Sequence, residues 1–247
     1  MPAQRYDRIG VGYTSYRQPD PRIEAQIWQA IGNAQRIVNV GAGAGSYELD
    51  DRGLVAVEPS AVMIGQRRVD SPPVVRAAAE HLPFPDQQFE VGLALMTIHH
   101  WGDMAVGLQE LRRVSKRQVI FTFDPAMHDA LWVFNEYVTA SIGFAEEAPL
   151  HTVMDAFGAD RVEVQVVPVP ADCIDGFASA YWQRPDMYLS PSARASISAF
   201  ARLSDDEVNP GMAQLRRDLE SGDWQKRHAD LLALDSFDAG LRLVIAH

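Results

Sequence analysis

The segment RIVNVGAGAGSYE, residues 36–48, constrains the fold more than any other stretch of this chain. Four β-compatible residues, 37–40, run directly into a loop with glycines at positions 41, 43 and 45. A glycine-rich loop after a strand brings bare backbone N–H groups close to whatever it contacts. Three interpretations stay open at this point: the loop binds a dinucleotide, binds another nucleotide-bearing cofactor, or forms only a tight turn.

Short apolar runs alternate with helical patterns up to about residue 158. The expected strands are 36–40, 54–57, 73–76, 90–96 and 118–123. Ser60 and Asp103 precede helical patterns and are residue types that cap helix N-termini, and an apolar helix is expected over 129–143. This alternation predicts βαβ units and a mostly parallel sheet.

The last third of the chain has a different pattern. A sixth strand is expected over 161–170 and a terminal strand over 241–247. About 70 residues separate them, and much of that stretch has a helical pattern. Because loops without secondary structure rarely exceed about 15 residues, we expect a helical insertion that lies over one edge of the sheet.

The charge balance argues against nucleic-acid binding. The chain has 22 Lys and Arg against 33 Asp and Glu, a net charge of −11, whereas nucleic-acid binders concentrate positive charge. No apolar stretch approaches the length of about 18 residues that a membrane span requires. The single cysteine, Cys173, allows neither an internal disulfide nor a cysteine-based zinc cluster. We therefore expect a cytoplasmic protein with no nucleic-acid or membrane partner.

An acidic residue at the end of the second expected strand bears on which kind of ligand the glycine loop binds. The loop reads G-x-G-x-G, and Ser46 stands where a dinucleotide fingerprint has its third small residue. Glu58 follows Gly41 by 17 residues. A carboxylate at that place can accept hydrogen bonds from both ribose hydroxyls of a nucleotide.

Four segments together resemble the class I S-adenosylmethionine-dependent methyltransferases, in particular the type 11 group. The segments, in chain order, are RIVNVGAGAGSYE, VAVEPSAVM, AAAEHLPFPDQQFEVGLALMTIHHW and LQELRRVSKRQVIFTF, between residues 36 and 123. Upstream, YTSYR (13–17) resembles the lid segment of that family. The sequence departs from the family pattern at Asn39 and Ala78, where the family has acids.

The resemblance implies an α/β fold: a Rossmann-like, doubly wound, mostly parallel seven-stranded sheet. It implies N-terminal lid helices over 1–35, a cofactor-binding core over 36–173, a helical cap over 174–240 between the last two strands, and a terminal strand over 241–247. The layout after the fifth strand is similar to that of trans-aconitate methyltransferase.

The resemblance also implies S-adenosyl-L-methionine as the cofactor, S-adenosyl-L-homocysteine as its product, and methyl transfer to a small-molecule acceptor. The residues expected to bind the cofactor are Tyr13, Arg17, Gly41, Ala42, Gly43, Glu58, Pro59, Met63, Ala79, Glu80, His81, Ala94 and Leu95. Two alternatives stay open: an NAD-dependent oxidoreductase, and a non-catalytic regulatory protein that binds S-adenosylmethionine.

His99 and His100 follow the fourth expected strand, near the place where a methyl acceptor would enter. Imidazole accepts a proton near neutral pH, so either residue is a candidate general base; alternatively, the pair anchors the loop. His81 and Asp103 would complete a set of metal-ligand types, but no metal spacing motif supports such a site, and no metal is expected.

The stretch GFASAYWQRPDMYL (176–189) is the candidate acceptor site. Tyr181 and Trp182, together with Trp132, could stack on a planar acceptor, and Arg184 could pair with a carboxylate. The competing interpretation is that these aromatic side chains fill the core.

Overall fold

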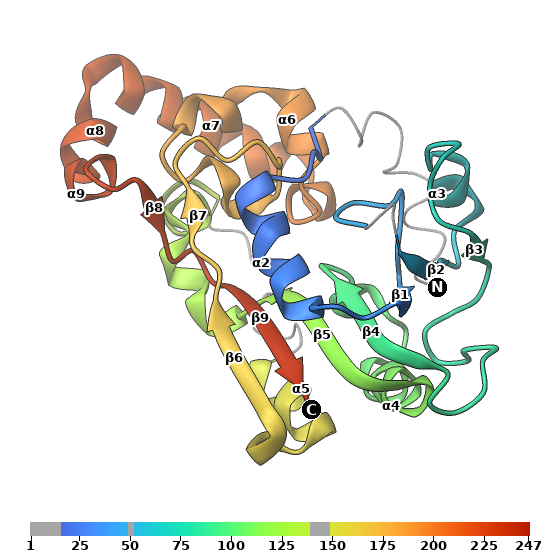
Figure 1. Cartoon of the computed structure of the whole chain (residues 1–247). Helices are drawn as coiled ribbons and strands as arrows, with labels where there is room; N and C mark the ends of the chain where they lie inside the picture. The colour runs from blue at the N-terminus through green and yellow to red at the C-terminus, as the bar shows by residue number, and fades with distance from the viewer. Residues whose placement is uncertain (1–15, 49–51, 139–148) are drawn as a thin grey trace.

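A seven-stranded sheet lies at the centre of the protein (Figure 1). The computed structural model describes residues 16–48, 52–138 and 149–247. The strands are β1 Arg36–Val40, β2 Gly53–Val57, β3 Val74–Val75, β4 Phe89–Leu95, β5 Ser115–Phe123, β6 Val162–Val166 and β9 Leu241–Ala246. Their order is β3-β2-β1-β4-β5-β9-β6, with β9 antiparallel to both neighbours and the first five strands parallel. The expected α/β fold with a mostly parallel seven-stranded sheet is confirmed.

Successive side chains of β1 enter different hydrophobic clusters, one on each face of the sheet. Ile37 belongs to the cluster that contains α2 (Pro21–Ile31), whereas Val38 and Val40 belong to the cluster that contains α4 (Met104–Val114) and α5 (Leu150–Phe157). A strand buried on both faces is typical of a parallel sheet covered by helices. β1 therefore lies in the interior, and its carboxyl end delivers the glycine loop to one edge of the sheet.

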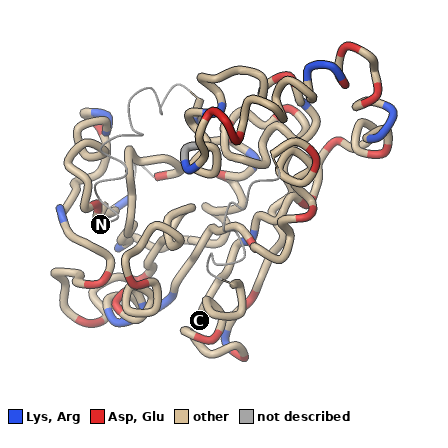
Figure 2. Tube along the Cα trace, turned by 180° about the vertical axis from the view of Figure 1, so that it is seen from behind, with Lys and Arg blue, Asp and Glu red and all other residues tan. Residues whose placement is uncertain are grey.

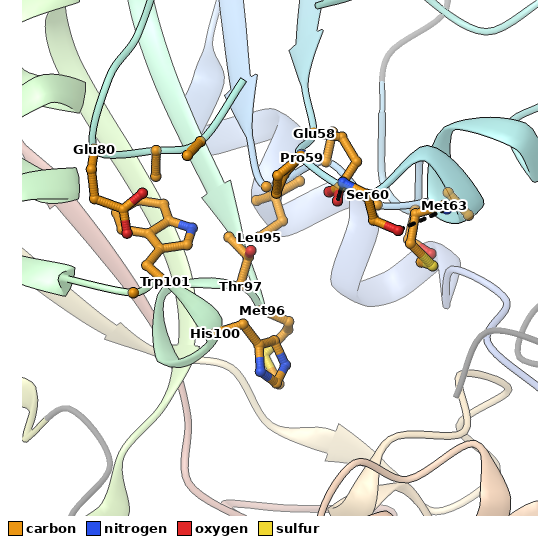
Figure 3. A pocket seen from close by; sticks show the side chains of 18 of the residues that line it. Glu58, Pro59, Ser60, Met63, Glu80, Leu95, Met96, Thr97, His100 and Trp101 are labelled. Carbon is orange, nitrogen blue, oxygen red and sulfur yellow. Dashed lines mark hydrogen bonds between the residues drawn. The ribbon is translucent and has the colours of Figure 1, made fainter. Parts of the chain in front are cut away.

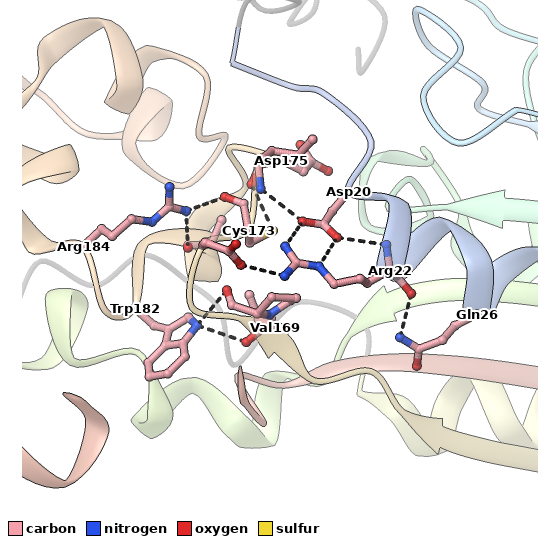
Figure 4. Close-up of polar contacts among 12 residues, drawn as sticks. Asp20, Arg22, Gln26, Val169, Cys173, Asp175, Trp182 and Arg184 are labelled. Carbon is pink, nitrogen blue, oxygen red and sulfur yellow. Dashed lines mark hydrogen bonds and ion pairs between the residues drawn. The ribbon is translucent and has the colours of Figure 1, made fainter. Parts of the chain in front are cut away.

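The N-terminal segment is fixed to the chain that follows β6 (Figure 4). Asp20 caps α2 by accepting a hydrogen bond from the backbone N–H of Arg22, and its other carboxylate oxygen accepts one from Ile174 N at 3.2 Å. Arg22 also pairs with Asp172 at 2.6 Å. Residues 150 and 154 positions apart in the sequence thus meet beside α2.

Short helices form the stretch between β6 and β9. They are η7 Ala178–Tyr181, η8 Pro185–Leu189, α6 Pro191–Ala195, η9 Phe200–Arg202, α7 Asp205–Ser221, α8 Asp223–Arg227 and α9 Ala229–Leu232. Figure 1 shows α6, α7 and α8 at the end of the sheet where the parallel strands finish. No helix in the described ranges is both long and apolar enough to cross a bilayer.

Two expected elements differ from the structure. The predicted strand over 161–170 is two strands, β6 and β7 (Val169–Pro170), and β7 pairs with β8 (Ser236–Phe237) in a separate ribbon. Pro168 lies between them and has no N–H to donate to a ladder. The predicted α-helix over 129–143 is, where it is described, the end of a 3₁₀ turn, η3 (Pro125–Ala130), and a π turn, η4 (Val133–Tyr137). Leu131, with φ −95° and ψ 78°, separates the two turns.

We predict that Gly211→Ala destabilises the protein. Alanine normally stabilises a helix interior by about 0.5–1 kcal/mol over glycine. In α7, however, a Cβ on Gly211 would lie 1.7 Å from the backbone oxygen of Tyr137, and overpacking costs about 1–3 kcal/mol. Urea unfolding measures the difference, with Gly65→Ala in α3 (Ala61–Gly65) as the control, because nothing lies within 4 Å of that Cβ. Equal effects of the two substitutions would contradict the close contact.

Candidate functional site

The glycine loop after β1 requires glycine for two physical reasons. Gly41 and Gly43 have φ values of +72° and +56°, a region that side chains disfavour. A Cβ on Gly41 would also lie 2.1 Å from Oγ1 of Thr97, which follows β4. The loop therefore passes close to the end of β4 and exposes its backbone at the carboxyl edge of the sheet.

Glu58, the residue after β2, holds this loop in place. Its side chain is buried, at 6% exposure, and accepts hydrogen bonds of 2.8 Å from Gly43 N through one oxygen and from Ser60 N through the other. Burial raises the pKa of the Glu58 carboxyl above its usual value, while the two N–H donors lower it. Each oxygen accepts one protein hydrogen bond and keeps a second acceptor position, as a diol ligand requires.

A buried ion pair supports the loop from behind. Arg67 pairs with Glu48 at 2.5 Å and donates to the backbone oxygen of Gly43 at 3.3 Å. Asn39 donates to Glu48 at 3.0 Å. The peptide groups of Gly43 are thus held by Glu58 on the N–H side and by Arg67 on the carbonyl side. Glu48 and Arg67 could not be singled out from the sequence, because no sequence motif marks either residue as part of a site.

A first cavity, of about 230 Å³, lies at the ends of β1, β2 and β4. Figure 3 shows Glu58 and Met63 on one side of it and Glu80 and Trp101 on the other. The residues predicted as cofactor ligands that line it are Arg17, Gly41, Ala42, Gly43, Glu58, Pro59, Met63, Ala79, Glu80 and Leu95. The lining residues missed from the sequence are Ala44, Ser46, Ser60, Ala78, Met96, Thr97, Trp101 and Gly102. Met96 and Thr97 could have been found, since they directly follow β4 at the same edge.

Two predicted cofactor ligands, Ala94 and His81, are not among the described residues that line this cavity. Ala94 is buried in the cluster on the α4 face of the sheet. His81 is exposed and outside the lining. Tyr13 lies outside the described residues.

A second cavity, of about 70 Å³, adjoins the first. Arg17, Met96 and His100 line both cavities, so we call these three residues the shared wall. The second cavity is completed by residues that follow β4, by residues at and after the end of β5, and by residues between β6 and β9, among them His99, Thr122, Phe177 and Ser179. Met96 has φ +52°, a costly conformation for a residue with a side chain that recurs at functional sites.

A buried carboxylate fixes Arg17 in the shared wall. Asp175, at 1% exposure, accepts a hydrogen bond of 2.6 Å from Arg17 Nε and one of 2.8 Å from the Tyr47 hydroxyl. Burial and the neighbouring charge of Asp175 raise the pKa of Tyr47 well above its usual range, so Tyr47 remains a donor. The N-terminal segment, the glycine loop and the chain after β7 meet at this one residue.

The two candidate bases lie at the cavities with their rings in contact. His99 lines the second cavity and His100 lines both, and their ring centroids are 3.8 Å apart. Burial, followed by the positive charges of Arg202 and Arg17, lowers the pKa of His99 to about 4. The His99 imidazole is therefore neutral at pH 7 and has a lone pair for a proton.

The four predicted acceptor residues are outside the lining of both cavities. The indole N–H of Trp132 donates to the backbone oxygen of Trp182 at 2.9 Å, and that of Trp182 donates to Val169 O at 3.1 Å. Arg184 donates to the backbone oxygens of Cys173 and Ala180 (Figure 4), and Tyr181 is buried. These side chains make structural contacts outside the two cavities, and their assignment to the acceptor site stays a prediction.

Comparison with known proteins identifies relatives along the whole chain. A family model described as a methyltransferase domain matches residues 38–123. The solved structure named "Putative methyltransferase from antibiotic biosynthesis pathway", of Anabaena variabilis ATCC 29413, is 30% identical, with a TM-score of 0.85 over 94% of this chain and 99% of that one. No curated protein sequence matches significantly.

Two more distant structures share the fold alone. The 4+2 cyclase SpnF is 14% identical, with a TM-score of 0.56 over 99% of this chain and 94% of that one. The YcgJ protein of Bacillus subtilis is 17% identical, with a TM-score of 0.50 over 91% of this chain and 96% of that one.

We predict that His99 titrates near pH 4. Because the pKa in the folded protein is below the ordinary value of about 6.5, the unfolded chain binds a proton first. The stability that depends on neutral His99 is then complete above about pH 6.5 and is lost as the pH falls toward 4. An NMR titration of the imidazole C–H signals, assigned by comparison with His99→Gln, measures the pKa. A midpoint near 6.5 would contradict the buried environment.

Proposed function

The chain belongs to the class I S-adenosylmethionine-dependent methyltransferases, and from this premise we propose that it methylates a small-molecule acceptor bound in the second cavity. The observation that carries the proposal is the shared wall: Arg17, Met96 and His100 line both cavities. A methyl group presented at this wall from the first cavity would face a molecule bound in the second.

The first cavity has the features that an adenosyl cofactor requires. Glu58 offers two carboxylate oxygens for the ribose hydroxyls. The buried indole N–H of Trp101 has no hydrogen-bond partner within the described ranges and can donate to the cofactor. A Cβ on Gly43 would lie 3.3 Å from the end of the Met63 side chain and would be strained by the φ of +56°, so glycine keeps the space beside the loop open.

We assign the remaining contacts in the first cavity by position. Ala79 and Glu80, which line this cavity, are assigned to the adenine, and Figure 3 shows Met63 on the side opposite Glu80. Contact of Arg17 with the methionine carboxylate stays a prediction, because Arg17 already pairs with Asp175. S-adenosylmethionine, the cofactor, supplies an electrophilic methyl group on a sulfonium. The protein contributes alignment and exclusion of water, because displacement requires the reacting atoms at about 3–3.5 Å and in line.

A small acceptor agrees with the size and charge of the site. The second cavity is much smaller than the first, and Phe177, Ile197 and Ala199 from the expected cap region, 174–240, line it. Figure 2 shows Lys and Arg interspersed with Asp and Glu along the described part of the trace, and the net charge of −11 is unlike that of a nucleic-acid binder. We propose that this region is the acceptor cover and that His99 or His100 accepts the proton if the nucleophile arrives protonated. Family membership removes the oxidoreductase alternative.

We predict that Glu58→Ala weakens S-adenosylhomocysteine binding by about 1.5–3 kcal/mol, the range for hydrogen bonds to a charged group. Calorimetry on the folded variant measures the loss. Glu163→Ala on the exposed side of β6 is the control and should bind normally. An unchanged dissociation constant for Glu58→Ala would remove Glu58 from the cofactor site.

We also predict that methyl-labelled S-adenosylmethionine transfers its label to a compound of low molecular mass. The assay uses a metabolite extract, separated by ultrafiltration into small and large components. Label in the small fraction that depends on active protein supports the proposal, and His100→Ala should lower the rate. Label confined to protein or nucleic acid would contradict the small acceptor, and a complete absence of transfer would favour the non-catalytic alternative.

A further inference from the structure

We propose that the second cavity takes an uncharged, largely apolar acceptor that carries a hydroxyl or ring N–H, and that Thr122 and Ser179 select it by hydrogen bonding. The inference rests on the proposed function, since it assumes that this cavity holds the acceptor. It goes further by assigning the acceptor's chemistry and the residues that recognise it.

Two buried hydroxyl groups in the second cavity are available to a ligand. Thr122 and Ser179 are 4% and 2% exposed, and both line the cavity. Within the described ranges neither hydroxyl has a hydrogen-bond partner. Both hydroxyl oxygens remain accessible from the cavity, unlike the enclosed unpaired atoms elsewhere in the described residues, so a ligand there can donate or accept a hydrogen bond.

The two hydroxyls come from different elements of the fold. Thr122 is on β5, and its backbone is fixed by pairing with Arg242 of β9. Ser179 is in η7, in the expected cap region. A molecule that bonds to both would therefore connect the core with its cover.

The rest of the lining favours an uncharged molecule. Most of it is apolar, from Phe123, Leu131, Phe177, Ile197 and Leu241. Among the described residues that line this cavity, Arg17 alone carries a full charge, and its guanidinium already pairs with Asp175. Arg202, whose charge also acts on His99, is outside the lining. A carboxylate would lose its water without gaining an unpaired cation in the lining, which is unfavourable.

His99 can take up the proton that the acceptor loses on methylation. Its imidazole lines the same cavity, and its ring nitrogens have no hydrogen-bond partner among the described residues. In the transfer, the acceptor's oxygen or nitrogen attacks the methyl carbon, and the carbon–sulfur bonding pair remains on sulfur as a neutral thioether. The acceptor's O–H or N–H proton passes to the lone pair of the His99 imidazole, which hands it on to water because its low pKa disfavours the charged ring.

Matched probes test the charge preference. The protein, saturated with S-adenosylhomocysteine, is titrated with phenol and benzoate, and with 3-hydroxypyridine and nicotinate, and binding is followed by NMR. We expect the uncharged member of each pair to bind at least on the order of tenfold more tightly, because a buried charge without a partner is disfavoured.

Single-hydroxyl variants test the two residues. Thr122→Val and Ser179→Ala should each weaken binding of the preferred probe by about three- to tenfold, the effect of one neutral hydrogen bond, and leave S-adenosylhomocysteine affinity unchanged. Ser196→Ala is the matched control. Its hydroxyl is also buried, but it donates to the backbone oxygens of Ala193 and Gly176, and it lines neither cavity. Probe binding should be unchanged in this control.

The contrary outcomes distinguish failure of this inference from failure of the first-cavity assignment. Preference for the carboxylates, binding of neither series to the loaded protein, or normal probe binding by both variants would overturn the inference while leaving the proposed function in place. Failure of the wild-type protein to bind S-adenosylhomocysteine would instead overturn the assignment of the first cavity.

Discussion

The buried carboxylate of Asp175 is the interaction on which the arrangement of the site depends. It joins Arg17 of the N-terminal segment and Tyr47 of the glycine loop to the chain that follows β7. Removing one partner of a buried ion pair leaves a charge without compensation, at about 3–5 kcal/mol. Without Asp175, Arg17 would lose the ion pair that fixes it in the shared wall. The chain after β7 would also lose its hydrogen bond with Tyr47 of the glycine loop.

The two cavities are formed by different parts of the chain. The ends of β1, β2 and β4 supply Glu58, the glycine loop and most of the first cavity, which a whole family can share. Residues between β6 and β9 complete the second cavity, and acceptor specificity is expected there. Fold alone would not have identified the activity, since the cyclase SpnF has a similar fold. The relative that is 30% identical over nearly its whole length identifies the family.

Local patterns in the sequence predicted the sheet, the glycine loop and the position of Glu58, because each depends on residues close together in the chain. Contacts between distant residues could not be predicted: Arg17 and Asp175 are 158 positions apart. The sequence could not show that Tyr181 and Trp182 are buried away from both cavities, because an aromatic side chain fits a binding site and a core equally well. Thr122 and Ser179 carry no signal in the sequence, since only their place in the second cavity distinguishes them.

A crystal structure of the protein with S-adenosylhomocysteine bound would test most directly whether the methyl group is presented to the second cavity. We expect the ribose hydroxyls to lie within hydrogen-bonding distance of Glu58. We also expect the thioether sulfur to face Arg17, Met96 and His100, with the second cavity open beyond it. A ligand whose ribose does not contact Glu58, or whose sulfur faces away from this wall, would contradict the proposed path of methyl transfer.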